Sequence, residues 1–312
     1  MNRYHIDYPD PSCAPEDRAD KSTAERAGPD KTVATTPSLR EVRGPTAFGS
    51  GGFSRAAELL WMLAVYDFKK AYHGTVLGYV WSVMRPLLMF SVLVIVFTQV
   101  FRAGSGVPHY PVMLLLNIVL FNFFTEATTM SVTSIVSQES IVRKTEFPRA
   151  IIPVSVVLTT AFTLVFNMIV VLVFMLAWGL KPRLTWLGLI LILLVLFWIT
   201  ACVSLILASL YPRFRDTAII WSVISTVLFY GTPVLYPAEI VPTPLAHFMQ
   251  ANPLAPVIEM ARVWMIDPNA PTPVELGGGA VSLMVSIGFT LLLGFVAVRV
   301  FTREAPRIAE SL

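Results

Sequence analysis

The stretches IIPVSVVLTTAFTLVFNMIVVLVFMLAWGL (Ile151–Leu180) and LTWLGLILILLVLFWITACVSLILASLY (Leu184–Tyr211) decide the fold class, because neither contains a charged residue. A helix needs about 20 apolar residues to cross the hydrocarbon core of a bilayer, and both stretches exceed that length. They therefore predict two neighbouring membrane-spanning helices.

The composition of the whole chain extends this prediction to the other segments. Of the 312 residues, 55% are hydrophobic and only 14% are charged, whereas about 25% of the residues of a soluble domain are charged. A formal charge of +3 lacks the basic excess of a nucleic-acid-binding protein, so no nucleic-acid partner is expected. We expect an all-α polytopic membrane protein with six transmembrane helices per subunit, near residues 85–103, 111–135, 151–178, 184–210, 217–236 and 279–301.

The segments that flank these spans have different compositions. Residues 1–52 combine charges with prolines and few aromatics, which predicts a disordered cytoplasmic tail, either passive or regulatory. Residues 53–74 have apolar side chains at helical spacing, which predicts an interfacial amphipathic helix or, alternatively, a soluble helix packed on a partner. Residues 75–305 would form the six-span domain, and residues 306–312 a short cytoplasmic C-terminus.

The basic residues indicate the orientation in the membrane. Six spans and a cytoplasmic N-terminus place twelve basic residues of the short loops and span ends inside and four outside, as the positive-inside rule requires. Both termini are therefore predicted to be cytoplasmic in a multi-pass protein of the plasma membrane. The inner residues are Arg55, Lys69, Lys70, Arg85, Arg143, Lys144, Arg149, Arg213, Arg215, Arg299, Arg303 and Arg307, and the outer ones are Arg102, Lys181, Arg183 and Arg262.

Three connections between the spans have distinctive sequences. On the inner side, SQESIVRKTEFPRAIIP (Ser137–Pro153) mixes charged and apolar residues and ends in two prolines, as an element that receives force would. The inner connection YPRFRD (Tyr211–Asp216) ends in an aspartate that either caps the next helix or takes part in gating. On the outer side, residues 238–275 alternate prolines with short apolar stretches, which predicts two re-entrant helices or a loop lying on the surface.

The chain shows no catalytic centre of its own. It contains no Gly-Lys pair, so the phosphate-binding motif GxxxxGK[ST] is absent. The four histidines are scattered without i, i+4 pairing, and the two cysteines cannot form a four-cysteine site. We therefore expect no catalytic residue, no metal site and no cofactor bound by this chain.

Ionisable side chains within the spans are few, and Glu126 and Arg85 are the candidates. Glu126 would either lie in the outer half of a substrate path or be capped by the hydroxyls of Thr125, Thr128 and Thr129. Arg85 lies at the depth of a lipid phosphate in the inner leaflet, where it would contact a lipid diphosphate or extend to ordinary headgroups. So little charge, without an energy-converting motif, favours energy supplied by another subunit.

Several motifs in order resemble a known family. LGYVWSVMRPLLMF (Leu77–Phe90) is followed by RKTEFPRAIIPV (Arg143–Val154), RFRDTAIIWSVISTVLFYGTPVLYP (Arg213–Pro237) and NPLAPVIEMARVW (Asn252–Trp264). The sequence from about residue 55 to 305 is similar to ABC-2 type permeases that export lipid-linked polysaccharides such as O-antigen, capsule and teichoic acid. The family often has glycine and tryptophan in the second span, where this chain has Asn117 and Asn122 or Phe123. The long tail resembles actinobacterial versions, whose cargo would be galactan.

The resemblance implies a homodimer that works with two cytoplasmic ATP-binding cassette subunits, which bind ATP and magnesium. The substrate would be a glycan linked to undecaprenyl or decaprenyl diphosphate, and membrane lipids would surround the complex. The residues that match the family's cytoplasmic gate or coupling element are Lys144, Phe147, Pro148, Arg149, Pro153, Arg215 and Asp216, and those that match its outer gate are Asn252, Pro253 and Arg262.

A glycan path needs aromatic faces, hydroxyls and amides rather than fixed charge. The aromatic residues of the spans are therefore candidates to line it, although membrane aromatics also serve as packing or interfacial residues. The candidates are Tyr79, Trp81, Phe97, Phe123, Phe124, Trp221, Phe229, Tyr230 and Tyr236.

Two other functions remain open from the residues alone. A stand-alone ion-coupled transporter or channel would use Glu126 and would be expected to show inverted repeats, which the sequence lacks. The second alternative function is that of a membrane scaffold without transport activity.

Overall fold

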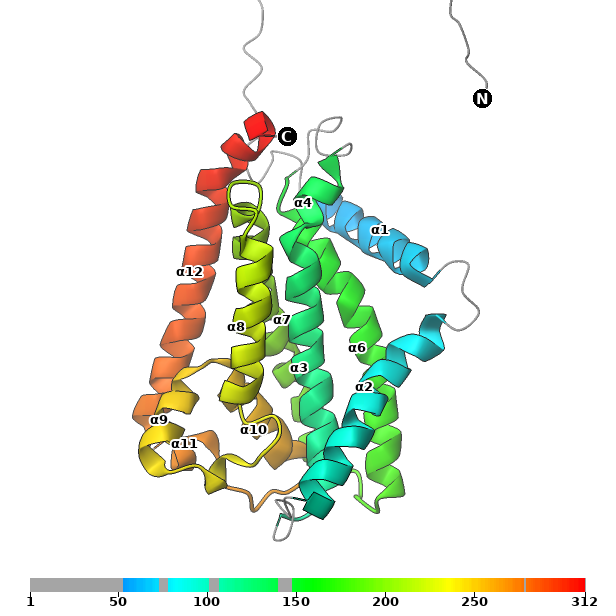
Figure 1. Ribbon diagram of the computed structural model, residues 1–312, viewed down its shortest axis with the longest axis vertical. Coiled ribbons are helices and arrows are strands. Elements are labelled where there is room, and N and C mark those ends of the chain that lie inside the picture. Colours follow the sequence, from blue (N-terminus) through cyan, green and yellow to red (C-terminus); the bar gives the residue numbers. More distant parts are fainter. Residues whose placement is uncertain (1–52, 73–77, 101–106, 140–147, 278, 312) are drawn as a thin grey trace, which may run out of the picture. The chain divides into compact units, whose positions relative to one another are not determined.

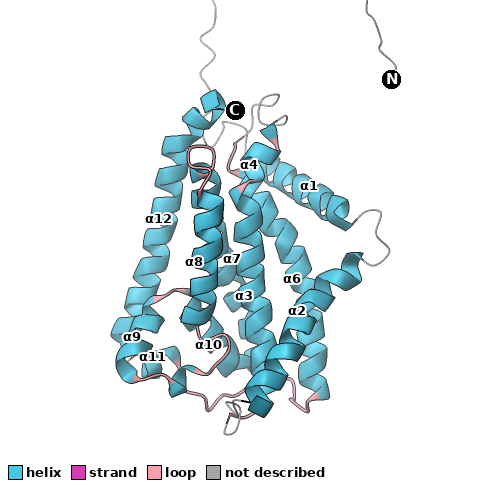
Figure 2. Ribbon diagram, viewed as in Figure 1, coloured by secondary structure: helices cyan, strands magenta, loops and turns pink. Residues whose placement is uncertain are grey.

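The computed structural model describes residues 53–72, 78–100, 107–139, 148–277 and 279–311, all of which belong to one compact unit of the chain. The predicted tail, 1–52, lies outside these residues. Within the described ranges the secondary structure is helical and contains no strand (Figure 2), which confirms the predicted all-α class. The longer helices are α1 (Phe53–Tyr72), α2 (Gly78–Ile95), α3 (Tyr110–Val132), α6 (Ile151–Ala177), α7 (Gly188–Leu210), α8 (Thr217–Gly231) and α12 (Ala280–Ser311).

Five segments are long and apolar enough to cross a membrane: Val80–Val100, Tyr110–Val132, Ile151–Ala177, Leu184–Leu210 and Ala280–Glu304. They contain α2 with the π-helical turn η1 (Val96–Val100), then α3, α6, α7 with the 3₁₀ turn η2 (Leu184–Leu187), and α12. The chain is a multi-pass membrane protein. The sixth predicted span corresponds to α8, which has 15 residues and is about 22 Å long, so the six-span count stays a prediction.

Four predicted boundaries differ from the structure. The span expected at 85–103 begins earlier, because α2 runs through Pro86 from Gly78. A helix in lipid tolerates an interior proline better than a break that would expose more backbone. The span expected at 217–236 ends at Gly231, because Thr232, which precedes a proline, is extended. The spans expected at 111–135 and 279–301 become α3, which ends at Val132, and α12, which continues to Ser311 through the expected C-terminal segment.

Helix α3 is the centre of the unit, in contact with α2, α6, α7, α8 and α10. Its sequence is apolar on all sides, which suits a helix surrounded by protein. Most of its side chains are buried, whereas α2 and α12 expose most of theirs. Figure 1 shows α3 between α8 and α6, with α2 crossing beside it. Most polar residues on α3 are therefore at least partly covered by other helices, although Thr129 is exposed.

Helix α1, in the range predicted to be amphipathic, packs against α6. The ring of Phe162 on α6 is 5.5 Å from that of Trp61 and 5.4 Å from that of Phe68, both edge to face. Thr159 also donates a hydrogen bond to the Ala64 carbonyl at 3.2 Å. In Figure 1, α1 runs oblique to the long helices. The interfacial position of α1 remains a prediction.

Short helices follow α8 and make up most of the region predicted as an outer re-entrant gate, 238–275. They are η3 (Ala238–Ile240), α9 (Thr243–Ala251), α10 (Leu254–Met265) and α11 (Pro273–Leu276), and α4 (Ser134–Ser137) extends the other end of α3. Figure 1 places α9, α10 and α11 at the end of the bundle opposite to α4. This agrees with the opposite sides predicted for the two gates, although a gating role for either is a prediction.

Candidate functional site

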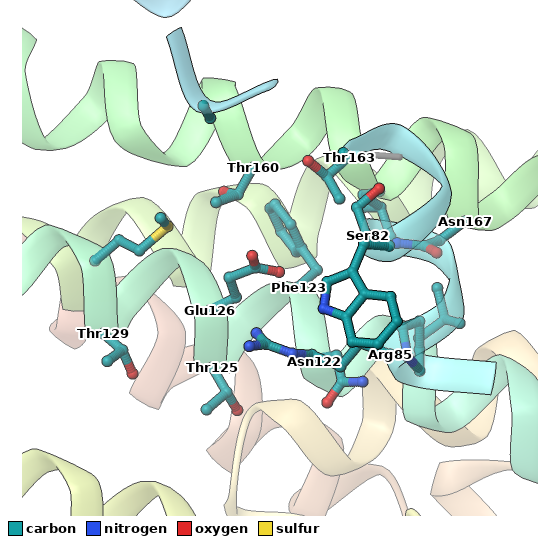
Figure 3. A pocket seen from close by; sticks show the side chains of 17 residues that line it. Ser82, Arg85, Asn122, Phe123, Thr125, Glu126, Thr129, Thr160, Thr163 and Asn167 are labelled. Atoms are coloured by element: carbon teal, nitrogen blue, oxygen red, sulfur yellow. The ribbon is translucent and has the colours of Figure 1, made fainter. Parts of the chain in front are cut away.

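A cavity of about 800 Å³ lies among the membrane-spanning helices α2, α3 and α6, with the end of α1 at its rim. Its volume is in the range of small-ligand sites, roughly 300–1,000 Å³. Figure 3 shows the polar side chains that converge on it. The lining residues are Ala71, Gly78, Trp81, Ser82, Arg85, Pro86, Val119, Asn122, Phe123, Thr125, Glu126, Thr129, Met130, Thr160, Thr163, Leu164 and Asn167.

Two opposite charges, Arg85 and Glu126, face this cavity from different helices. In Figure 3 the Arg85 guanidinium extends from α2 toward the Glu126 carboxyl on α3. The two charges interact electrostatically. The structure thus brings together both ionisable residues that the sequence singled out.

The position of Glu126 along α3 bears on one expectation. Glu126 is closer to the Val132 end of α3, which leads to α4, than to the Tyr110 end. With the predicted orientation this end lies in the inner half of the membrane. The expected outer-half location and the predicted orientation therefore exclude each other, and both stay predictions.

The alternative of hydroxyl capping for Glu126 is not observed. The Thr128 hydroxyl donates to the Phe124 carbonyl at 2.7 Å and accepts the indole N–H of Trp221 at 3.1 Å. The Thr125 hydroxyl has no hydrogen-bond partner within the described part of the chain. The Glu126 carboxyl therefore faces the cavity, where a ligand can reach it.

Uncharged polar side chains complete the cavity wall. They have helical spacing, with Asn122 and Thr129 on the same face of α3 as Glu126, and Thr160, Thr163 and Asn167 on one face of α6. Sequence reasoning noticed Asn122 only as a departure from the family and missed the three residues of α6. The i, i+3, i+7 spacing of those three residues in an otherwise apolar run was the signal that could have found them.

Of the nine predicted path aromatics, Trp81 and Phe123 line the cavity. Trp81 is 64% exposed, whereas Trp221 is 7% exposed and packs edge to face on Phe124. Phe229 packs against Phe121, with ring centroids 5.2 Å apart.

Three further path candidates, Phe97, Tyr230 and Tyr236, are not among the lining residues. Phe97 is half-buried against the core, and Tyr230 is exposed. The Tyr236 hydroxyl donates to the Tyr230 carbonyl at 2.9 Å. The side chain of Tyr79 is outside what the structure describes.

The inner connection 137–153 is described in part, and Lys144 and Phe147 lie outside the described residues. Pro148 opens the turn into α6, accepting the Ile151 N–H at 3.0 Å. Pro153 is buried in the first turn of α6, where a proline is tolerated. Arg149 is half-buried, and burial lowers the pKa of its guanidinium.

The same connection is joined to α1. Gln138 donates to the Asp67 carboxylate at 3.3 Å. Burial raises the pKa of Asp67, and the hydrogen bond from Gln138 opposes that shift. This hydrogen bond joins the start of the 137–153 segment to α1, whose end lies at the cavity rim.

The second inner connection exposes both of its predicted residues, Arg215 and Asp216. Asp216 precedes α8, yet its side chain makes no capping hydrogen bond. The capping alternative is therefore not observed. Its neighbour Arg213 forms a partly exposed ion pair with Glu304 of α12 at 3.6 Å.

Among the predicted outer-gate residues, Arg262 is the centre of a buried ion cluster. Its guanidinium is 2.8 Å from a Glu239 oxygen and 3.7 Å from a Glu259 oxygen. The other Glu259 oxygen accepts the Ala238 N–H at 3.3 Å. Sequence reasoning missed both glutamates, although the i, i+3 spacing of Glu259 and Arg262 was visible.

The other two outer-gate residues, Asn252 and Pro253, connect α9 to α10. The Asn252 amide donates to the Thr232 hydroxyl at 3.0 Å, and its oxygen accepts the Leu254 N–H at 3.1 Å. Pro253 is buried immediately before α10. These contacts join α10 to the non-helical segment that follows α8.

The Glu259 carboxyl predicts a pH-dependent stability. Burial in α10, outside the five spanning segments, raises the pKa of Glu259 from 4.5 to about 7, against the opposing effect of Arg262. Between these values the folded chain holds a proton that the unfolded chain has released. The stabilisation is therefore complete below pH 4.5 and is lost as the pH rises through about 7.

The midpoint temperature of thermal unfolding should decrease between pH 5 and pH 8 in the wild type. We expect this decrease, measured in nanodiscs, to be smaller in Glu259→Gln. Glu58→Gln, which alters an exposed carboxyl on α1, serves as the control and should keep the wild-type slope. An unchanged slope in Glu259→Gln would assign the pH dependence to another group.

Within the described ranges no three His, Cys, Asp or Glu side chains lie close enough to hold a metal ion. What the described residues offer is a mostly apolar cavity inside a helical membrane bundle, into which one cation, one anion, amides, hydroxyls and two aromatic rings are set. Such a set can hydrogen-bond and stack on a polar ligand.

Comparison with known proteins agrees with this architecture. Residues 58–266 match the family described as ABC-2 type transporter. The chain is 30% identical to the O-antigen export system permease protein RfbA of Klebsiella pneumoniae, over 82% of this chain and 95% of that protein. It is 27% identical to a protein of the same name from Myxococcus xanthus, over 81% and 95%. It is 23% identical to the polysialic acid transport protein KpsM of Escherichia coli, over 75% and 89%. Since the family match covers about two-thirds of the chain, this protein belongs to the ABC-2 type transporter family.

Proposed function

We propose that the chain is the permease subunit of an ATP-driven exporter, which moves a polyprenyl-diphosphate-linked polysaccharide out of the cytoplasm. It would work in the plasma membrane as a homodimer with two ATP-binding cassette subunits, which bind ATP and magnesium. Both termini would be cytoplasmic. Relatives named for O-antigen export and polysialic acid transport support the cargo class.

The observation that carries the proposal is the composition of the cavity. Its surface is mostly apolar, with amides, hydroxyls and two aromatic rings set into it, and among the described lining residues one cation and one anion oppose each other. A sugar offers many hydroxyl groups and an apolar ring face, so it matches such a wall better than an inorganic ion does.

The test is reconstitution of the chain with the ATP-binding subunit encoded beside it. Export of the lipid-linked glycan into proteoliposomes should require ATP, and ATP hydrolysis should require this chain. A stand-alone ion-coupled carrier predicts instead transport that follows a proton or sodium gradient without ATP and is abolished by Glu126→Gln. If glycan export is intact in cells that lack the chain, the chain is instead a membrane scaffold without transport activity.

Coupling between the subunits is expected to depend on Arg149. This residue is half-buried at the start of α6, in the connection that is joined to α1 through Gln138 and Asp67. We expect Arg149→Ala, and likewise Phe147→Ala, to lower export by about tenfold or more while ATP hydrolysis and assembly persist, which corresponds to about 1.4 kcal/mol of lost coupling.

The measurement compares glycan transported with ATP hydrolysed in the same proteoliposomes. Arg299→Ala, which removes an exposed basic residue of α12, is the control and should keep the wild-type ratio. Equal ratios in Arg149→Ala and the wild type would remove Arg149 from the coupling element.

A further inference from the structure

The charges of the cavity limit what can bind there. Among the described residues that line it, Arg85 and Glu126 are the only ionisable side chains. They interact with each other, so the net charge of the wall is close to zero. Arg85 would attract a bare phosphate or diphosphate, and Glu126 would repel it, so the two effects oppose each other. Both are strong because charges interact strongly where water is scarce. The cavity is therefore poorly suited to a ligand that offers charge alone.

Its neutral groups are suited to a polyol. The amides of Asn122 on α3 and Asn167 on α6 both line the cavity. Among the described residues, neither amide has a hydrogen-bond partner. Each amide can donate and accept, and the Glu126 carboxylate can accept two or more hydrogen bonds. Sugar hydroxyls both donate and accept, so one pyranose ring can use these groups together.

An aromatic face completes the match. Trp81 is 64% exposed and lines the cavity beside Phe123. The C–H face of a pyranose ring packs against such a surface.

The place of the cavity beside α2 lets a lipid-borne headgroup enter. Val80, Met84, Leu88 and Val92 lie four residues apart on α2 and are all exposed, which forms an apolar stripe alongside Arg85. A polyprenyl chain can remain in the bilayer against this stripe while its headgroup reaches between the helices. A water-soluble sugar nucleotide lacks that contact.

We propose that this cavity binds the sugar that adjoins the lipid diphosphate, and that the opposed charges of Arg85 and Glu126 make it select sugar-bearing lipid over the sugar-free carrier. The inference rests on the proposed function, because the cargo class comes from there. Arg85 contacts the phosphate, and Glu126 both hydrogen-bonds the sugar and keeps Arg85 from capturing a phosphate alone. Glu126 is thus a specificity-determining residue.

The test measures binding to the purified full chain in nanodiscs by quenching of tryptophan fluorescence. The probes are undecaprenyl diphosphate carrying one N-acetylglucosamine, sugar-free undecaprenyl diphosphate, and phosphatidylglycerol. We expect the wild type to bind the sugar-bearing lipid about tenfold more tightly than the other two, a difference that a few hydrogen bonds can supply.

Glu126→Gln should reverse this preference. With Arg85 no longer opposed, affinity for sugar-free undecaprenyl diphosphate should rise about five- to tenfold, while affinity for the sugar-bearing lipid falls. Arg85→Gln should weaken both diphosphates together. Glu58→Gln, which removes an exposed carboxyl on α1, should keep the wild-type ratio and serves as the control for charge.

The outcomes separate this site from the proposed function. If the reconstituted complex exports glycan but the ratio is the same in Glu126→Gln and the wild type, the site assignment is overturned and the function stands. If the ratio changes but no ATP-dependent export is found, the site stands and the function fails. Equal binding of phosphatidylglycerol and the sugar-bearing lipid would make the cavity a general headgroup site and also overturn the assignment.

Discussion

Arg262→Ala is expected to lower the free energy of unfolding by about 3–5 kcal/mol at pH 8, the usual cost of leaving a buried charge without its partner. Arg262 is 3% exposed and lies between Glu239 and Glu259. Removing it leaves the Glu259 carboxylate in a buried position with only the Ala238 N–H as a partner. The loss should be smaller at pH 6, because Glu259 can then take up a proton.

The measurement is chemical or thermal unfolding of the two proteins in nanodiscs at both pH values. Arg213→Ala offers a matched control, because Arg213 also pairs with a glutamate but its side chain is 56% exposed. Breaking such a surface pair should cost about 1 kcal/mol or less. The double variant Arg262→Ala with Glu259→Gln should recover much of the loss. Equal stability of Arg262→Ala and the wild type at pH 8 would show that this cluster does not stabilise the outer end.

The spans could be predicted from the sequence because a bilayer imposes a simple requirement on length and polarity. The charge-free stretch Ile151–Leu180 became α6, Ile151–Ala177. The end of α8 has a local signal in Thr232, which precedes Pro233. The path of the chain after it could not be predicted in the same way, because it depends on tertiary hydrogen bonds, in which the Asn117 amide of α3 donates to the carbonyls of Pro233 and Val234 at 3.2 and 3.3 Å.

The cavity could be predicted only in part. The polar residues Thr160, Thr163 and Asn167 fall on one helical face, a pattern visible in the sequence. That this face meets Asn122 and Glu126 of α3 depends on how the helices pack, which spacing within one helix does not determine. The outer cluster has the same limit, because Glu239 lies far along the chain from Arg262 and reaches it only through the fold.

The aromatic residues show most clearly that the sequence does not determine which side chains face the cavity. Trp81 and Trp221 both lie in apolar runs and were both predicted to line a glycan path. Their environments differ because Trp221 lies on the face of α8 that packs against α3, where its indole contacts Phe124 and Thr128, whereas the Trp81 side chain on α2 is largely exposed. No local pattern distinguishes a tryptophan that faces a neighbouring helix from one that faces a cavity.

Substitution of these two tryptophans by alanine should therefore have opposite effects on stability and on ligand binding. Trp221→Ala should lower the free energy of unfolding by about 3–5 kcal/mol, the cost of emptying a large buried site. It also removes the edge-to-face contact with Phe124, at 6.0 Å, and the hydrogen bond to Thr128. Trp221→Phe keeps a ring there and should lose about 1 kcal/mol for the missing hydrogen bond.

Trp81→Ala should behave in the opposite way, with stability close to the wild type because the side chain is 64% exposed. It should lose affinity for sugar-bearing lipid and, in the reconstituted complex, export. The comparison measures unfolding and lipid binding for both variants in the same nanodiscs. If Trp221→Ala folds with wild-type stability and fails only in binding, Trp221 belongs to the glycan path and the burial argument is wrong. If Trp81→Ala binds sugar-bearing lipid as the wild type does, the indole is no part of the sugar site, and the cavity must hold its ligand through Arg85, Glu126 and the two amides alone.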